Sequence, residues 1–357
     1  MNSAGLRKGF TTGTCAQAAA KGACIMLTQR KQLGRVEVIT PSGVKLSIRL
    51  IDQEIGDDFA KCAVVKDAGS DPDITNGAKI CAEVKFFKGE GVKIKGGKGV
   101  GRATLPGLAV SVGEWAINPT PRRMILGEVS RFLPQEKGIE VTISVPDGER
   151  LAKKTFNPKL GIAGGISIIG TTGIVEPKSL DAYKATLALQ LDVLKAQGYN
   201  DPVFVLGYVG EAFCKDKLKL KKGSMIKIGD HIGFILKECV KRKIKKVLLA
   251  GHIGKLIKLT SGQFNTHCDF GDNRLDSIAG YAASCGADKK LVVKILCQKT
   301  AEAVIPILRE VELADAVFMR IAADVSNKCR EFVKGKVAVS CSLLSLTGEL
   351  LAKTDGL

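Results

Sequence analysis

The pattern of apolar and polar positions changes in character about halfway along the chain. In the first half, short runs alternate apolar and polar residues, which predicts strands and hairpins around an alanine-rich helix. Residues 1–152 are therefore expected to form an α+β domain. The predicted elements are a helix at 16–27, a hairpin made of 36–39 and 44–48, strands at 62–65, 80–86 and 139–145, and an amphipathic helix at 124–132.

In the second half, two apolar runs, 202–206 and 246–250, each lead into a Gly-x-x-Gly turn and then a helix-like segment. Strands that alternate with helices predict a mostly parallel sheet, whose ligands bind beyond the carboxyl ends of the strands. The fold class is therefore α/β, with a doubly wound, Rossmann-like C-terminal domain at 153–357. The boundary is expected between Gly148 and Asn157, and helices are expected at 180–196, 232–240 and 300–308.

A glycine-dense, apolar segment at 157–177 begins this predicted second domain. It alternates β-branched residues with glycines and then gives Thr171-Thr172-Gly173, which suits a backbone that approaches a ligand closely. A pair of buried strands joined by glycine turns explains the same pattern.

Composition narrows the choice of partners. The 357 residues include 54 Lys and Arg against 36 Asp and Glu, a formal charge of +18, so nucleic acids, phosphorylated metabolites and polycarboxylates are all candidates. One Trp and four Tyr leave few rings for stacking bases, which argues against nucleic acid. Eleven cysteines without a Cys-x-x-Cys pair indicate reduced thiols in a cytoplasmic protein. No apolar run reaches transmembrane length, so no membrane association is expected. The oligomeric state stays open, a homo-oligomer included.

Several short motifs carry candidate chemistry. Thr11, Thr12 and Thr14 precede the alanine-rich helix, where they could cap it or contact a ligand. Asp67 lies in an Asp- and Gly-rich loop that fails the EF-hand pattern, because Asn76 stands where glycine is required. The loop is explained by turn formation or by a carboxylate that faces a substrate.

Two prolines at a predicted helix start place Arg122 or Arg123 near its first turn, where a forked guanidinium suits a carboxylate. The turn from Gly251 to Lys255 resembles a phosphate-binding loop but lacks its first glycine and its Ser or Thr. His252 in that turn is a candidate ligand contact or cap. No metal motif emerges, so no metal site on the protein is predicted.

Taken together, these motifs resemble the CbiD family, the cobalt-precorrin-5B C-1-methyltransferases of anaerobic cobalamin biosynthesis. The matching stretches are 9–15, 65–77, 116–122, 157–177, 251–256 and 265–267. The resemblance implies methyl transfer from S-adenosylmethionine to C-1 of a cobalt-containing, ring-contracted tetrapyrrole to give cobalt-precorrin-6A, with the cobalt carried by the substrate. Tyr208-Val209 departs from the family, in which Asn-Tyr or Asn-Phe is expected, and Cys268 stands where a small hydroxyl residue is expected.

Site residues follow as expectations from the motifs and the resemblance. The methyl donor is assigned to Gly164, Gly165, Gly170, Thr171, Thr172, Gly173 and Glu176. The polycarboxylate tetrapyrrole is assigned to Thr11, Thr12, Thr14, Arg122, His252, Lys255, Asn265 and His267, and the catalytic candidates are His252, Asp67 and Thr12. Two alternatives remain: a phosphate-handling transferase that uses Gly251 to Lys255, and a basic RNA-binding protein that uses the lysine clusters.

Overall fold

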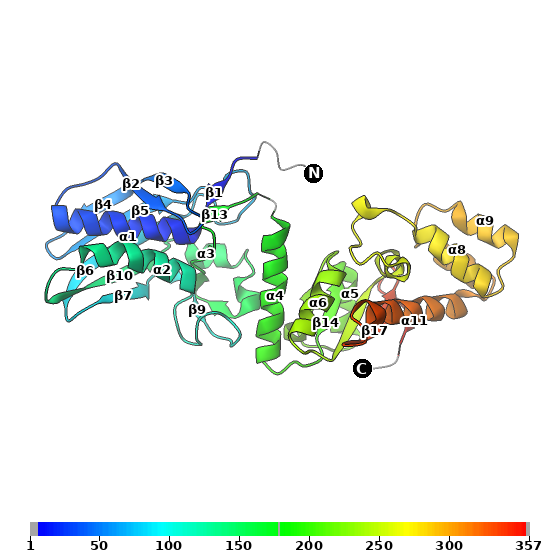
Figure 1. The fold of residues 1–357 in the computed structure, drawn as a ribbon. Coiled ribbons are helices and arrows are strands. Elements are labelled where there is room, and N and C mark those ends of the chain that lie inside the picture. Colours follow the sequence, from blue (N-terminus) through cyan, green and yellow to red (C-terminus); the bar gives the residue numbers. More distant parts are fainter. Residues whose placement is uncertain (1–5, 178, 355–357) are drawn as a thin grey trace. The chain divides into compact units, whose positions relative to one another are not determined.

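The computed structural model describes residues 6–177 and 179–354. The chain divides into two compact units, Met1–Leu180 and Asp181–Leu357, and each has its own sheet and core (Figure 1). Among the described residues, no helix is both long enough and apolar enough to cross a membrane.

The first unit is built around a mixed five-stranded sheet with the strand order β4-β5-β6-β10-β7. Its neighbours pair antiparallel except β10 and β7, which pair parallel. Helices α1 and α2 pack against each other and against the sheet (Figure 1). Ala16, Ala19, Ala20 and Ala23 of α1 are fully buried, and their small side chains allow the helix to lie close to the strands.

The elements of the first unit are β1 (Gly9–Phe10), α1 (Thr12–Gln29), β2 (Arg35–Ile39), β3 (Lys45–Arg49), β4 (Ile51–Ile55), β5 (Phe59–Val65), β6 (Lys79–Lys88), β7 (Val92–Gly96), β8 (Gly99–Val100), β9 (Arg102–Ala103), α2 (Pro119–Val129), β10 (Lys137–Ser144), α3 (Gly148–Ala152), β11 (Ile162–Ala163), β12 (Gly165–Ile166) and β13 (Ile174–Val175). Single 3-10 turns lie at Ser130–Phe132 and Asn157–Leu160.

The second unit contains a five-stranded sheet in the order β15-β14-β16-β17-β18, parallel except for β18. Its elements are α4 (Leu180–Ala196), β14 (Val203–Leu206), α5 (Gly207–Asp216), β15 (Met225–Lys227), α6 (Ile232–Lys241), β16 (Lys246–His252), α7 (Ile253–Leu256), α8 (Arg274–Ser284), α9 (Lys289–Leu296), α10 (Val304–Glu310), α11 (Ala314–Phe332), β17 (Ala338–Leu344) and β18 (Leu350–Lys353). Single 3-10 turns lie at Lys222–Ser224, Ile257–Ser261 and Cys268–Phe270.

The two faces of this second sheet are covered by different helices. Val203, Val205 and Leu248 pack with Phe213 and Cys214 of α5 on one face. The alternate strand residues pack on the other face with apolar side chains from α4, α6 and α11. Helices on both faces of a parallel sheet are the doubly wound arrangement that the strand and helix pattern predicted.

Most of the predicted elements are confirmed, with boundaries shifted by a few residues. The predicted helix at 300–308 is wrong at its start, because α10 begins only at Val304. Pro306 explains the difference, since it has no N–H to donate and its ring would clash with the carbonyl of Glu302 in a longer helix.

The segment 157–177 belongs to the first unit and not to the second. Its short strands do not pair with each other: β11 pairs with β9, β12 with β8, and β13 with β1. The division of the structure therefore falls after Leu180, whereas the predicted boundary lies between Gly148 and Asn157. The composition changes at residue 157, but the segment that begins there packs in the first unit. A boundary placed at this change of composition is therefore too early in the chain.

Candidate functional site

The threonines at the start of α1 meet the glycine turn of the segment 157–177, although about 155 residues separate them. Thr12 Oγ1 accepts a hydrogen bond from Ile169 N at 2.9 Å, and Thr14 Oγ1 donates to Gly173 O at 2.7 Å. The backbone adds two bonds, from Gly13 N to Ile169 O and from Thr11 N to Gly173 O. We call Thr11, Thr12, Thr14, Gly170 and Gly173 the Thr-Gly clasp.

The two glycines of the clasp leave room for parts of the same chain. A Cβ atom on Gly170 would lie 2.2 Å from Thr11 Oγ1, and one on Gly173 would lie 2.7 Å from Thr40 Cβ. The three threonines are buried and their hydroxyls are occupied by internal hydrogen bonds. The clasp therefore joins two distant segments, and its buried hydroxyls are used in bonds within the protein; the assignment of the three threonines to the substrate stays a prediction.

Other predicted donor-site residues lie nearer the surface. Gly164, Thr171 and Thr172 are exposed, whereas Gly165 is buried where β12 runs close to Gly99 of β8. Glu176 is exposed and pairs with Lys8 at 2.7 Å.

Asp67 is held by Arg7 and by the backbone N–H of Gly69. The hydrogen bonds from Arg7 lower the pKa of the Asp67 carboxyl, with a smaller contribution from the Gly69 amide. A carboxylate with a lowered pKa is a weak base near neutral pH, so the geometry favours an anchoring role for Asp67 over proton abstraction. In the same loop, the buried Lys66 pairs with Asp73 at 2.6 Å.

Arg122 lies in the first turns of α2, as the prolines before it predicted. Its guanidinium donates to the carbonyl of Ile117 at 3.1 Å and lies 3.6 Å from Glu114. Arg122 is therefore already partnered, whereas the next residue, Arg123, is exposed and bonds only to the hydroxyl of Thr120 among the described residues.

In the second unit, several polar side chains lie beyond the carboxyl ends of the parallel strands, at what we call the carboxyl edge of the sheet. The chain leaves β14 through α5 toward β15 on one side and later leaves β16 toward β17 on the other. The connections therefore part in opposite directions between β14 and β16, which is the topological switch point where open α/β sheets bind ligands. The turns at Gly207 and His252 lie at this point.

His252 uses both of its ring nitrogens in this turn. Nδ1 accepts a hydrogen bond from Gly254 N at 3.1 Å, and Nε2 lies 2.9 Å from a carboxylate oxygen of Glu302. The same oxygen accepts a bond from Leu346 N at 3.0 Å, just after β17. Because Nδ1 accepts from the backbone, Nε2 is the nitrogen that donates to Glu302, and His252 thereby connects three loops.

Asp230 follows β15 and forms a second polar centre. Its Oδ1 accepts from the Thr266 hydroxyl at 2.6 Å and from Lys255 Nζ at 3.0 Å. Burial acts to raise the pKa of the Asp230 carboxyl, but these two donors outweigh it and the pKa is lowered. Asp230 is therefore an ionised carboxylate, and its Oδ2 accepts no hydrogen bond from the part of the chain that the structure describes.

The remaining predicted residues, Asn265 and His267, lie in the loop before α8. The side chain of Asn265 accepts from His267 N, and His267 Nδ1 accepts from Asp269 N. His267, Cys268 and Asp269 bring their ligand atoms within 4.8 Å of one another, but all three are exposed. Exposed side chains that cap a turn do not make a metal site by themselves.

The structure thus places the predicted residues in two groups, one in each unit. Sequence reasoning missed Asp230 and Glu302, and it missed Gln17 and Glu128 in the first unit. A signal for Asp230 was present, because an acid about 20 residues beyond a strand and glycine turn is the spacing of a ribose-binding carboxylate. Glu302, Gln17 and Glu128 have no comparable local pattern.

The fold defines an open α/β protein whose sheet has a topological switch point at its carboxyl edge, preceded by an α+β unit. Sequence models of the CbiD family match it, one named CbiD at residues 1–177 and one named CbiD, C-terminal domain at residues 265–355. The cobalt-precorrin-5B C(1)-methyltransferase of Thermoanaerobacter sp. (strain X514) is 44% identical over 349 residues, which is 98% of this chain and 95% of the relative. The enzyme of the same name from Methanocaldococcus jannaschii is 44% identical over 344 residues, or 96% and 95% of the two chains.

This chain belongs to the CbiD family. A crystal structure of the cobalamin biosynthesis protein CbiD from Archaeoglobus fulgidus is 31% identical and covers 78% of this chain and 84% of that one, with a TM-score of 0.39.

Proposed function

We propose that this protein transfers a methyl group from S-adenosylmethionine to C-1 of cobalt-precorrin-5B, giving cobalt-precorrin-6A in anaerobic cobalamin biosynthesis. The observation that carries the proposal is identity of 40% or more, over nearly the whole length of both chains, to relatives named cobalt-precorrin-5B C(1)-methyltransferase. The cobalt is part of the substrate. Eleven free cysteines agree with a cytoplasmic location, where thiols stay reduced.

The reaction requires alignment more than acid-base chemistry. The new carbon–carbon bond forms as the carbon–sulfur bond of the sulfonium breaks, and the sulfur keeps the electron pair as S-adenosylhomocysteine. Holding the two reactants in line and away from water supplies most of what such a displacement needs. His252 is hydrogen-bonded at both ring nitrogens, which fits a role in shaping the site and not in taking a proton.

We place the nucleoside of the donor at the carboxyl edge of the second sheet, with Asp230 facing its ribose. Asp230 lies at the end of the strand that follows the β14–glycine turn–α5 unit, and its Oδ2 is unoccupied by the described residues. A carboxylate at this position of an open α/β sheet commonly accepts hydrogen bonds from ribose hydroxyls. The earlier assignment to Gly164–Glu176 stays a prediction, and the internal contacts of the clasp favour the second unit.

Calorimetric titration with S-adenosylhomocysteine, with ATP as the control ligand, tests the donor site. We expect saturable binding of the nucleoside product and none of ATP. Asp230→Asn keeps an acceptor for Thr266 but loses the charge, and it should raise the dissociation constant about tenfold, the size of one charge-assisted hydrogen bond. Asp216→Asn, an exposed change in the same unit, should leave the constant unchanged.

Turnover is measured by incubating the enzyme with cobalt-precorrin-5B and labelled donor. Transfer of the labelled methyl group to the tetrapyrrole is the expected result. Binding of ATP in place of the nucleoside product, with no methyl transfer, would instead favour a phosphate-handling enzyme.

A further inference from the structure

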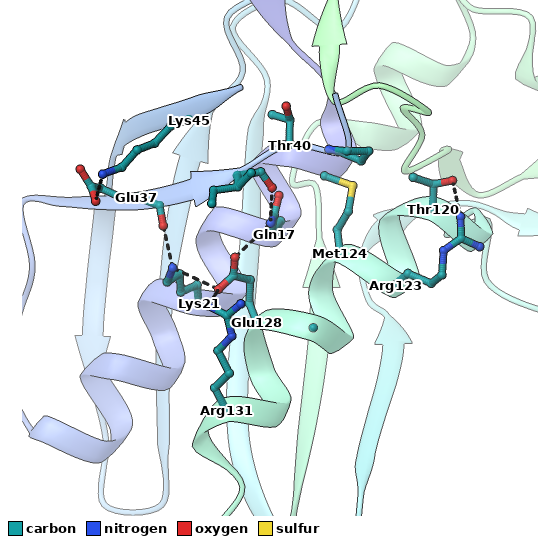
Figure 2. Close-up of a pocket in the computed structure, with 13 residues that line it drawn as sticks. Gln17, Lys21, Glu37, Thr40, Lys45, Thr120, Arg123, Met124, Glu128 and Arg131 are labelled. Atoms are coloured by element: carbon teal, nitrogen blue, oxygen red, sulfur yellow. Dashed lines mark hydrogen bonds and ion pairs between the residues drawn. The ribbon is translucent and has the colours of Figure 1, made fainter. Parts of the chain in front are cut away.

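A cavity of about 650 Å³ lies in the first unit between α1, α2 and the hairpin strand β2 (Figure 2). Its volume is within the range of small-molecule sites. The walls include Gln17, Lys21, Thr40, Arg123, Met124 and Glu128. Of these residues, the sequence motifs had pointed only to Arg123, as an alternative to Arg122 for a substrate carboxylate.

A buried carboxylate forms the polar centre of the cavity. Glu128 of α2 is only 6% exposed and receives hydrogen bonds or ion pairs from Gln17 at 3.1 Å, Lys21 at 3.0 Å and Arg131 at 3.4 Å. Figure 2 shows these three side chains converging on Glu128. The negative charge of Glu128 is therefore already satisfied from within the protein.

Gln17 is the second buried polar side chain next to the cavity. The residue is 3% exposed, and its amide nitrogen donates to Ile39 O and to Glu128, both at 3.1 Å. Its Oε1 is buried and has no hydrogen-bond partner among the described residues. A buried acceptor without a donor is costly, so the side chain of Gln17 is held in place by its donated bonds to Ile39 and Glu128 and not by its own acceptor.

The charge of the walls selects the kind of ligand. The cavity is lined by more cationic than anionic side chains. The four cations are Lys21, Lys45, Arg123 and Arg131, and the two carboxylates are Glu37 and Glu128. Lys45 is paired with Glu37 at 2.9 Å, and Lys21 and Arg131 are paired with Glu128. No carboxylate of the described residues lies within ion-pair distance of Arg123, so its guanidinium is available to an anion.

Apolar groups complete the cavity. Met124 and Pro41 contribute to its walls, and Ile39 is 62% exposed beside it. An anion with an apolar body fits these walls, whereas the sulfonium donor, which is cationic, is disfavoured by the excess of positive charge.

We propose that this cavity binds a carboxylate side chain of the tetrapyrrole substrate, with Arg123 facing the carboxylate. The inference rests on the proposed function. It also gives the Thr-Gly clasp a role, because Thr40 packs against Gly173 and Ser42 N donates to Thr172 O, so the clasp holds the turn that forms one wall of the cavity.

Gly127 offers a clean way to block the cavity. It lines the cavity, and a Cβ atom on it would meet nothing within 4 Å. The Cβ atom of Gly127→Leu therefore enters open space beside the cavity, and in the last turn of α2 leucine favours the helix over glycine. Gly127→Ala is the matched control, because it makes the same backbone change with little volume.

The probe is uroporphyrin, a stable tetrapyrrole with carboxylates on every pyrrole ring, titrated into the full-length protein and followed by its absorbance. We expect Gly127→Leu to abolish binding and Gly127→Ala to leave it unchanged. Arg123→Gln should weaken binding about tenfold. Arg150→Gln removes the same charge from an exposed site outside the cavity and should have no effect.

Two results would overturn the proposal: absence of porphyrin binding by the parent protein, or equal binding by the parent, Gly127→Leu and Arg123→Gln. The donor titration separates this failure from failure of the proposed function. If the variants bind S-adenosylhomocysteine and methylate cobalt-precorrin-5B with an unchanged KM for the tetrapyrrole, the function stands and the cavity is excluded as its site. If the parent binds porphyrin through the cavity but transfers no methyl group, the binding site stands and the function is wrong.

Discussion

Gly173→Ala is predicted to destabilise the first unit, because two costs meet at this position. Gly173 has a φ of +82°, a left-handed conformation that costs an L-residue about 1–2 kcal/mol. Its new methyl group would also lie 2.7 Å from Thr40 Cβ and 3.0 Å from Pro41 Cδ. Overpacking of this kind costs about 1–3 kcal/mol, so the expected loss in free energy of unfolding is about 2–5 kcal/mol.

Gly164→Ala separates the two costs. Gly164 has a φ of +78° in the same segment, but a Cβ atom there would meet nothing within 4 Å. It should lose only the conformational term, and both variants change the entropy of the unfolded chain alike. The difference between them, about 1–3 kcal/mol, therefore measures the packing of Gly173 against Thr40.

Urea unfolding followed by tryptophan fluorescence makes this measurement specific to the first unit. The chain has one tryptophan, Trp115, which lies in that unit and stacks on Arg102. With a urea slope of about 1–3 kcal/mol per molar, the two variants should differ in midpoint by about 1 M. Equal midpoints would refute the close packing of the clasp against the hairpin turn.

Three further outcomes are expected. Asp73→Asn should destabilise the first unit near neutral pH, because the pKa of the Asp73 carboxyl is lowered in the folded protein. The stability that this carboxylate contributes is present above its unfolded pKa and is lost as the pH falls through its folded pKa. Acid should therefore abolish the difference in urea midpoint between this variant and the parent. In the native protein, Ellman's reagent should modify the exposed Cys268 and Cys297 first and reach all eleven thiols only after denaturation. Glu302→Ala frees His252 and should weaken binding of S-adenosylhomocysteine without moving the Trp115 unfolding transition.

Local patterns in the sequence predicted the elements of the second unit well. The strand–glycine–helix repeats around Gly207 and Gly251 specify parallel strands, and the strand order places both turns at the switch point. Such repeats can be recognised from the sequence, because hydrophobic periodicity and turn-forming residues depend on positions that are close together in the chain. Asp230 could have been predicted in the same way, from its distance in sequence beyond the glycine turn.

The contacts that build the first unit have no such local signal. Thr12 reaches Ile169, 157 residues away, and Gln17 reaches Glu128, 111 residues away. Each of these residues alone has an ordinary explanation as a cap or a helix residue, and only the tertiary fold brings them together. The glycine-dense segment was therefore recognised as special, but its close contacts with Thr11, Thr40 and the rest of the first unit were not foreseen.

A glycine indicates that a side chain at its position is sterically excluded or is not needed. It does not indicate which atoms, if any, occupy the space that a side chain would fill. At Gly173 the space is filled by Thr40 and Thr14, whereas at Gly127 a Cβ atom would meet open space beside Glu128. Substitutions at the two positions should therefore differ in what they affect: a methyl group at Gly173 lowers stability, whereas a larger side chain at Gly127 leaves the fold intact but fills the cavity. A pair of variants that separates unfolding from porphyrin binding in this way would distinguish the glycines that assemble the first unit from the one that keeps its cavity open.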